Sequence, residues 1–137
     1  MKITEIQKVP KNRIGRIEAK NVHLEAHEYD TMLFLSQYGF DIEVIKPANI
    51  PRTHNPDFLI NGGVWEAKSP EGQGKYNLQR QFHNAGHQAG NLVLDLRRFK
   101  MPASCSEKDA LKRFGFSRSI KHLLLITKDG RLLDIRK

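Results

Sequence analysis

The stretch "NPDFLINGGVWEAK", residues 55–68, decides how this 137-residue chain is expected to fold. Two short apolar runs, "DFLI" and "VWEAK", flank an Asn-Gly-Gly sequence at 61–63 that favours the left-handed backbone of a tight turn. The stretch therefore predicts a β-hairpin. Because side chains alternate along a strand, we expect Glu66 and Lys68 on one face and Ala67 on the other.

Upstream of this hairpin, the pattern predicts one helix and one strand. A helix is expected over residues 22–38, where apolar residues recur at helical spacing and Gly39 provides a stop. Alternating apolar and polar residues at 40–45 indicate a strand. The expected apolar face of the helix comprises Ala26, Tyr29, Leu33 and Phe34.

Downstream, the pattern predicts a second helix at 75–90, a buried strand at 92–96 and a short helix at 107–114 opened by Ser106 in a variant of the capping box. A final hairpin is expected at 122–136, around a Lys-Asp-Gly turn. The predicted fold class is α/β (α+β): a single domain with a central, mixed, twisted β-sheet flanked by helices.

The charge distribution favours a polyanionic partner. The net charge is +8, yet residues 21–67 carry only two basic groups against seven acidic ones. We expect carboxylates in this segment to hold a cation while the basic surroundings hold the phosphates of a nucleic acid. A solvated basic surface without any nucleic acid remains the alternative.

Other features exclude several classes of protein. The single cysteine, Cys105, cannot form an internal disulfide, and no Cys/His spacing matches a structural zinc site. No apolar run approaches the roughly 20 residues that span a bilayer, and the first ten residues lack the apolar core of a signal peptide. We therefore expect a cytoplasmic protein with no membrane partner.

Asp57, Glu66 and Lys68 are the candidate catalytic residues. Two carboxylates brought together repel each other, so a divalent cation between them is expected, and oxygen ligands favour Mg²⁺ or Mn²⁺. A lysine beside that cation would orient or deprotonate a water and stabilise charge on a phosphoryl group. The alternative is a surface charge patch, with Asp57 only capping a turn after Pro56.

The order Pro56, Asp57, an eight-residue gap, then Glu66, Ala67 and Lys68 resembles the motif of the PD-(D/E)XK nuclease superfamily. The stretch "NAGHQAGNLVLDLRR", residues 84–98, resembles the second helix and following strand of the tRNase toxin domain at the C-terminus of contact-dependent inhibition (CdiA) proteins. The similarity covers approximately residues 22–100.

This resemblance implies a PD-(D/E)XK nuclease-like fold and a role for each matching residue. It makes the carboxylates of Glu28, Asp57 and Glu66 and the carbonyl of Ala67 the metal ligands, and Lys68 the catalytic lysine. Glu25, one turn before Glu28, is the alternative for the helix ligand. The catalytic set implied by the resemblance is completed by a glutamine of the second helix, Gln88.

A basic rim is expected to bind the substrate, although a solvated face is the default for each residue taken singly. Two histidines of the second helix are spaced so that they share one face, and they are expected to contact phosphate. A zinc-protease site is not expected, because "HNAGH" lacks the glutamate of that motif. The expected substrate-binding residues are Lys75, Arg80, His83, His87, Arg97 and Arg98.

The sequence thus predicts a metal-dependent endonuclease that hydrolyses phosphodiester bonds in RNA, as a tRNase-like toxin. A DNA endonuclease of the same superfamily and a noncatalytic nucleic-acid-binding protein stay open, because the same chemistry serves both nucleic acids. The resemblance implies a cognate immunity protein as a partner. The expected organisation is one nuclease domain over 1–137, with a basic segment at 1–20, a motif-bearing core at 22–100, and a short helix and hairpin at 101–137.

Overall fold

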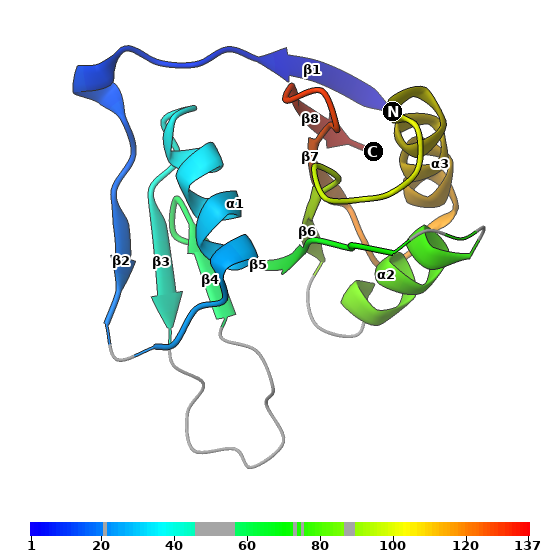
Figure 1. Ribbon diagram of the computed structural model, residues 1–137, viewed down its shortest axis with the longest axis horizontal. Helices are drawn as coiled ribbons and strands as arrows, with labels where there is room; N and C mark the ends of the chain where they lie inside the picture. The colour runs from blue at the N-terminus through cyan, green and yellow to red at the C-terminus, as the bar shows by residue number, and fades with distance from the viewer. Residues whose placement is uncertain (21, 46–56, 73, 75, 87–89) are drawn as a thin grey trace. The chain divides into compact units, whose positions relative to one another are not determined.

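The computed structural model describes residues 1–20, 22–45, 57–72, 74, 76–86 and 90–137, apart from the side chains of residues 45 and 57. The chain divides into two compact units. The C-terminal unit comprises Met1–Ile6 with Glu66–Lys137, and the N-terminal unit comprises Gln7–Trp65. Each unit contains several strands and at least one helix, and the boundary falls within β5 (Figure 1).

The sheet of the C-terminal unit is mixed. Its strands lie in the order β1 (Lys2–Ile6), β8 (Leu132–Arg136), β7 (His122–Ile126), β6 (Asn91–Asp95) and the second half of β5 (Gly63–Lys68). The pairs β1–β8 and β8–β7 are antiparallel, whereas β7–β6 and β6–β5 are parallel. Figure 1 shows β1 from the start of the chain beside β8 from its end.

Two helices, α2 (Asn77–Gly86) and α3 (Ala103–Phe116), pack on one face of this sheet. Alternate residues of β6, β7 and β8 face these helices, as the pleat of a strand requires. Burying this face supplies most of the hydrophobic stabilisation of the unit. The shared core comprises Leu78, Phe82, Ala85, Leu92, Leu94, Leu96, Phe99, Ala110, Phe114, Ile120, Leu123, Leu125, Leu133 and Ile135.

The N-terminal unit combines a small sheet with one helix. Strand β2 (Ile17–Ala19) pairs in parallel with β3 (Ile42–Ile45), which pairs antiparallel with β4 (Asp57–Ile60) and so leads to the first half of β5. The helix α1 (Ala26–Ser36) and a 3₁₀ turn at Lys11–Arg13 complete the unit.

The α+β class with a mixed sheet and flanking helices is confirmed, as are both predicted hairpins. The expected second helix corresponds to α2. Three details were wrong or missed: the face of α1, the start of α3, and the strands β1 and β2. Among the described residues, no helix is long and apolar enough to cross a membrane.

The buried face of α1 differs in part from the predicted one. Phe34 is buried, as predicted. Tyr29 and Leu33 are 47% and 37% exposed, whereas Met32 and Leu35 are almost fully buried. Apolar residues occur on several sides of this helix, so periodicity alone could not select the side that packs. Gly39 does end the helical segment, and its φ of +89° is the left-handed backbone that favours glycine.

The helix α3 begins at Ala103, four residues before the predicted start at residue 107. Pro102 precedes the first turn, and Ser106 is buried inside the helix. Its hydroxyl donates to the carbonyl of Ala103 at 3.1 Å, so Ser106 caps nothing. Proline is well suited to a helix start because its fixed φ and missing N–H cost little there, which the sequence reading overlooked.

Candidate active site

Strand β5 places Glu66 and Lys68 on the same face of the sheet. Lys68 Nζ lies 3.3 Å from Glu66 Oε1, and the two side chains are 17% and 9% exposed. The residues pair in parallel register with Leu92 and Leu94, which belong to the core beneath α2 and α3. The ion pair therefore lies on the face that these helices cover, at the side of their apolar core.

A carboxylate as buried as that of Glu66 is uncommon in a structural strand. Removing a charge from water is costly unless partners compensate it, and Lys68 supplies one such partner at ion-pair distance. Buried, paired ionisable groups occur at functional sites more often than elsewhere. Glu66 and Lys68 thus have the environment expected of a chemical site.

The hairpin of β4 and β5 lies between Asp57 and Glu66 in the sequence. Its turn has positive φ at Asn61 (49°) and Gly62 (86°), which is the geometry predicted from the Asn-Gly sequence. The last backbone pair of the β4–β5 ladder joins Phe58 to Trp65. The Asp57 side chain lies outside the described part of the structure.

Glu28 has a local role at the start of α1. Its Oε1 accepts a hydrogen bond from the Glu25 backbone N–H at 2.9 Å, while the Glu25 side chain accepts one from the Glu28 backbone. This reciprocal capping box satisfies two N–H groups that a helix end leaves without partners. Both candidate glutamates of this helix are therefore engaged in capping, and a role for either in binding metal stays a prediction.

Within the described residues, no three His, Cys, Asp or Glu side chains lie together as a metal site. This statement does not cover the Asp57 carboxylate, because the Asp57 side chain is not among the described ones. Hard oxygen donors at Glu66, Asp57 and the Ala67 carbonyl remain the ligand chemistry that Mg²⁺ or Mn²⁺ prefers. The metal stays a prediction.

The comparison with known proteins bears on the whole motif. Residues 53–132 match the family of the contact-dependent growth inhibition CdiA C-terminal domain, which is more than half of the chain. The chain belongs to the CdiA C-terminal domain family. The matched region contains Asp57, Glu66 and Lys68, whereas Glu28 lies before it.

A solved structure supports the fold. The chain resembles one in the CdiA-CT/CdiI toxin and immunity complex from Burkholderia pseudomallei, with a TM-score of 0.64 and 19% sequence identity. The alignment covers 90% of this chain and 100% of the other. No curated protein sequence matches. The predicted CdiA relationship is confirmed, and membership of the PD-(D/E)XK superfamily stays a prediction.

Two of the predicted substrate-binding arginines of this CdiA C-terminal domain make internal contacts. Arg97 Nη2 lies 2.8 Å from the buried Asp95 carboxylate. Arg98 donates to the Ser69 carbonyl at 2.7 Å and lies 3.5 Å from Glu71. The Arg98 contacts hold the chain just after Lys68, so Arg98 has a positioning role whether or not it also meets substrate.

Two of the other predicted substrate residues, Arg80 and His83, are exposed on α2. Lys75 and His87, and the predicted catalytic residue Gln88, lie outside the described residues. Nothing in the described part of the chain tests their contact with substrate.

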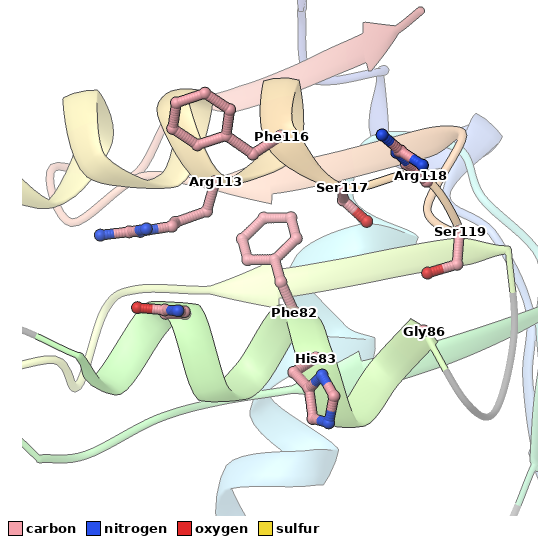
Figure 2. A pocket seen from close by; sticks show the side chains of 9 residues that line it. Phe82, His83, Gly86, Arg113, Phe116, Ser117, Arg118 and Ser119 are labelled. Carbon is pink, nitrogen blue, oxygen red and sulfur yellow. The ribbon is translucent and has the colours of Figure 1, made fainter.

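One feature escaped the sequence reading. A groove of about 420 Å³ opens between α2 and the end of α3 (Figure 2), and it is named here the α2–α3 groove. The stretch "RFGFSR" at 113–118, with arginines interleaved with aromatic residues, carried the signal that could have predicted it. The groove is lined by Gln79, Phe82, His83, Gly86, Arg113, Phe116, Ser117, Arg118 and Ser119.

Proposed function

We propose that this CdiA C-terminal domain is a nuclease toxin that hydrolyses phosphodiester bonds in RNA, with tRNA as the first substrate to test, in a metal-dependent reaction. Membership of the family supports a toxic activity of the nuclease type. The observation that carries the proposal is the buried Glu66 carboxylate held 3.3 Å from the Lys68 ammonium within the Pro-Asp…Glu-Ala-Lys motif.

The proposed ligands of the metal are Glu66, Asp57 and the Ala67 carbonyl, with Glu28 from α1 as a further carboxylate. Asp57 is included because it is the first carboxylate of the Pro-Asp…Glu-Ala-Lys motif. A divalent cation bound there would polarise the phosphoryl group and lower the pKa of a bound water.

Lys68 is proposed to act on the reacting phosphoryl group. Its ammonium carries three donors on a flexible stem, and its neighbour Glu66 keeps it in place before substrate arrives. With Glu66 holding a cation, Lys68 would be free to stabilise negative charge on the phosphate oxygens. Arg98 supports this step by holding Ser69 and with it the end of β5.

We propose RNA, and not DNA, as the substrate because of the size and charge of the chain. A chain of 137 residues with a net charge of +8 attracts polyanions but offers little surface for reading a long duplex. A folded RNA presents loops and ends within a compact target. The proposed place of action is the cytoplasm, where tRNA is found, and the proposed protein partner is a cognate immunity protein, as in the complex from Burkholderia pseudomallei.

The test is cleavage of total tRNA and of plasmid DNA by the purified protein with Mg²⁺, Mn²⁺ or EDTA. We expect tRNA cleavage that requires metal and is abolished in Glu66→Gln, because the amide keeps the shape but not the charge that holds a cation. Glu107→Gln is the matched control, since Glu107 also pairs with a cation, Arg131, at 2.7 Å in the same unit.

The possible results separate the readings. Cleavage of plasmid DNA alone would replace RNA by DNA as substrate. Full activity in EDTA would remove the metal from the proposal. Binding of nucleic acid without cleavage under any condition would return the chain to a noncatalytic binding protein.

A further inference from the structure

The α2–α3 groove combines positive charge with an aromatic surface. Phe116 is 69% exposed at its rim, and Phe82, only 4% exposed, forms the base. Figure 2 shows Phe82 pointing from α2 toward α3, with Arg113 toward one end of the opening and Arg118 toward the other. An exposed aromatic ring between two guanidinium groups suits a ligand that combines a flat ring with negative charge.

Neither arginine is fully engaged within the protein. Among the described residues Arg113 pairs with Asp109, with Nε 3.4 Å from Oδ1, and this buried Nε has no hydrogen-bond acceptor there. Arg118 makes no ion pair or hydrogen bond to the part of the chain that the structure describes. By contrast, the carboxylate of Asp95 holds Arg97 closely. The groove thus presents the guanidinium of Arg118 as a donor to an anionic ligand, while Arg113 adds positive charge at the other end.

The far end of the groove is closed by a tight contact between α2 and the segment after α3. A Cβ added to Gly86 would lie 2.4 Å from Ser119 Oγ, so only glycine lets this hydroxyl approach the helix. The Ser117 hydroxyl accepts a hydrogen bond from Ile120 N at 3.1 Å and keeps its own proton for donation. Two hydroxyls therefore add neutral donors beside Arg118.

We propose that the α2–α3 groove binds one nucleotide of a single-stranded nucleic acid, with its base against Phe116 and its flanking phosphates at Arg113 and Arg118. A cavity of about 420 Å³ accommodates a nucleotide. A single strand is specified because a base of a duplex is stacked on its neighbours and cannot offer its face to an aromatic ring. The inference rests on the proposed function only in taking nucleic acid as the ligand.

The test measures binding of a fluorescein-labelled oligonucleotide of about 12 nucleotides, as RNA and as DNA, by fluorescence anisotropy in EDTA. Probe integrity is checked on a gel. Phe116→Ala is expected to weaken binding roughly five- to tenfold at every salt concentration, because stacking involves no counterion. Tyr76→Ala is its matched control, since Tyr76 is an aromatic residue of the same unit, 58% exposed, outside the groove.

Arg118→Gln should change the salt dependence instead. Loss of one phosphate contact lowers the slope of log affinity against log salt by about 0.7 for a single strand. Lys108→Gln removes an exposed positive charge of α3 outside the groove and should leave that slope closer to that of the unchanged protein. Phe116→Leu, which keeps apolar bulk without an aromatic face, guards against an effect of folding, and thermal melts of all variants accompany the titrations.

Equal affinities and slopes for the groove variants and their controls would overturn the inference. Its failure differs from failure of the proposed nuclease. Groove variants that bind normally, beside a Lys68→Ala protein that binds but does not cleave, would refute only the groove. Binding that depends on Phe116 and Arg118, without cleavage of RNA or DNA in Mg²⁺ or Mn²⁺, would support the groove and refute the nuclease.

Discussion

Replacing Lys68 by methionine removes one ammonium group and keeps most of the aliphatic stem. In the free protein the change leaves the Glu66 carboxylate, whose side chain is 9% exposed, without the cation 3.3 Å away. Fully exposed pairs contribute about 0–1 kcal/mol, and breaking a fully buried pair costs about 3–5 kcal/mol. Because Lys68 is itself 17% exposed, we expect an intermediate loss of about 2 kcal/mol.

For a chain of 137 residues that loss corresponds to a fall of about 7 °C in the unfolding temperature. Cleavage of tRNA at saturating enzyme should fall by about 10²-fold or more, since a donor to the reacting phosphoryl group is missing. Mg²⁺ or Mn²⁺ should restore part of the stability of Lys68→Met but none of its activity, because a cation at Glu66 replaces the lost charge in one role only.

The assays are thermal unfolding with and without metal, and single-turnover cleavage beside it. Lys128→Met is the control, because Lys128 donates to the Met101 carbonyl at 2.9 Å and has no place in the proposed site. Unchanged unfolding temperature together with unchanged cleavage in Lys68→Met would refute the reasoning. A loss of stability that metal does not reduce would show that Glu66 does not bind the added cation.

Three further predictions concern stability and ionisation. Leu94→Ala empties a fully buried position and should cost about 2–5 kcal/mol in urea unfolding, and a loss below about 1 kcal/mol would contradict the described core. Gly39→Ala should destabilise more than Gly130→Ala, because both have φ near +90° but only the Cβ at 39 would lie 3.2 Å from a valine methyl. Hydrogen bonds from the Thr127 hydroxyl and, with a smaller effect, from the Arg131 guanidinium hold the pKa of Asp129 below its ordinary value. Thr127→Val should therefore raise that pKa in an NMR titration. Stabilisation from this hydrogen bond is present above the ordinary aspartate pKa and is lost as pH falls through the lowered one, so an unshifted titration in the unchanged protein would refute it.

Local chemistry explains which elements the sequence could predict. The two hairpins depend on turn residues with positive φ, Gly62 and Gly130, and such signals are read within a few residues of the chain. The strand β1 could not be predicted in its place, since its partner β8 lies at the opposite end of the chain and only tertiary pairing brings them together. Propensity carries no information about such a partner.

The same distinction between local and tertiary information applies to the residues of the candidate site. Alternation along β5 correctly put Glu66 and Lys68 on one face, because the period of two is a property of the strand itself. The buried pair of Asp95 with Arg97 was not predicted, since a basic run after a strand has the same composition whether it faces solvent or a carboxylate. Burial, which composition does not report, decides between these outcomes.

The capping hydrogen bond of Glu28 would compete with the metal-binding role proposed for this residue. While the Glu28 carboxylate accepts a hydrogen bond from the Glu25 N–H, the first turn of the helix stays closed and that amide is protected from hydrogen exchange with solvent. A cation that recruits Glu28 must first take it from this amide, so metal uptake and fraying of the helix end would be linked in both directions. Amide exchange at Glu25 would then speed up on addition of Mg²⁺, and a helix end mutated to fray would bind that ion more tightly.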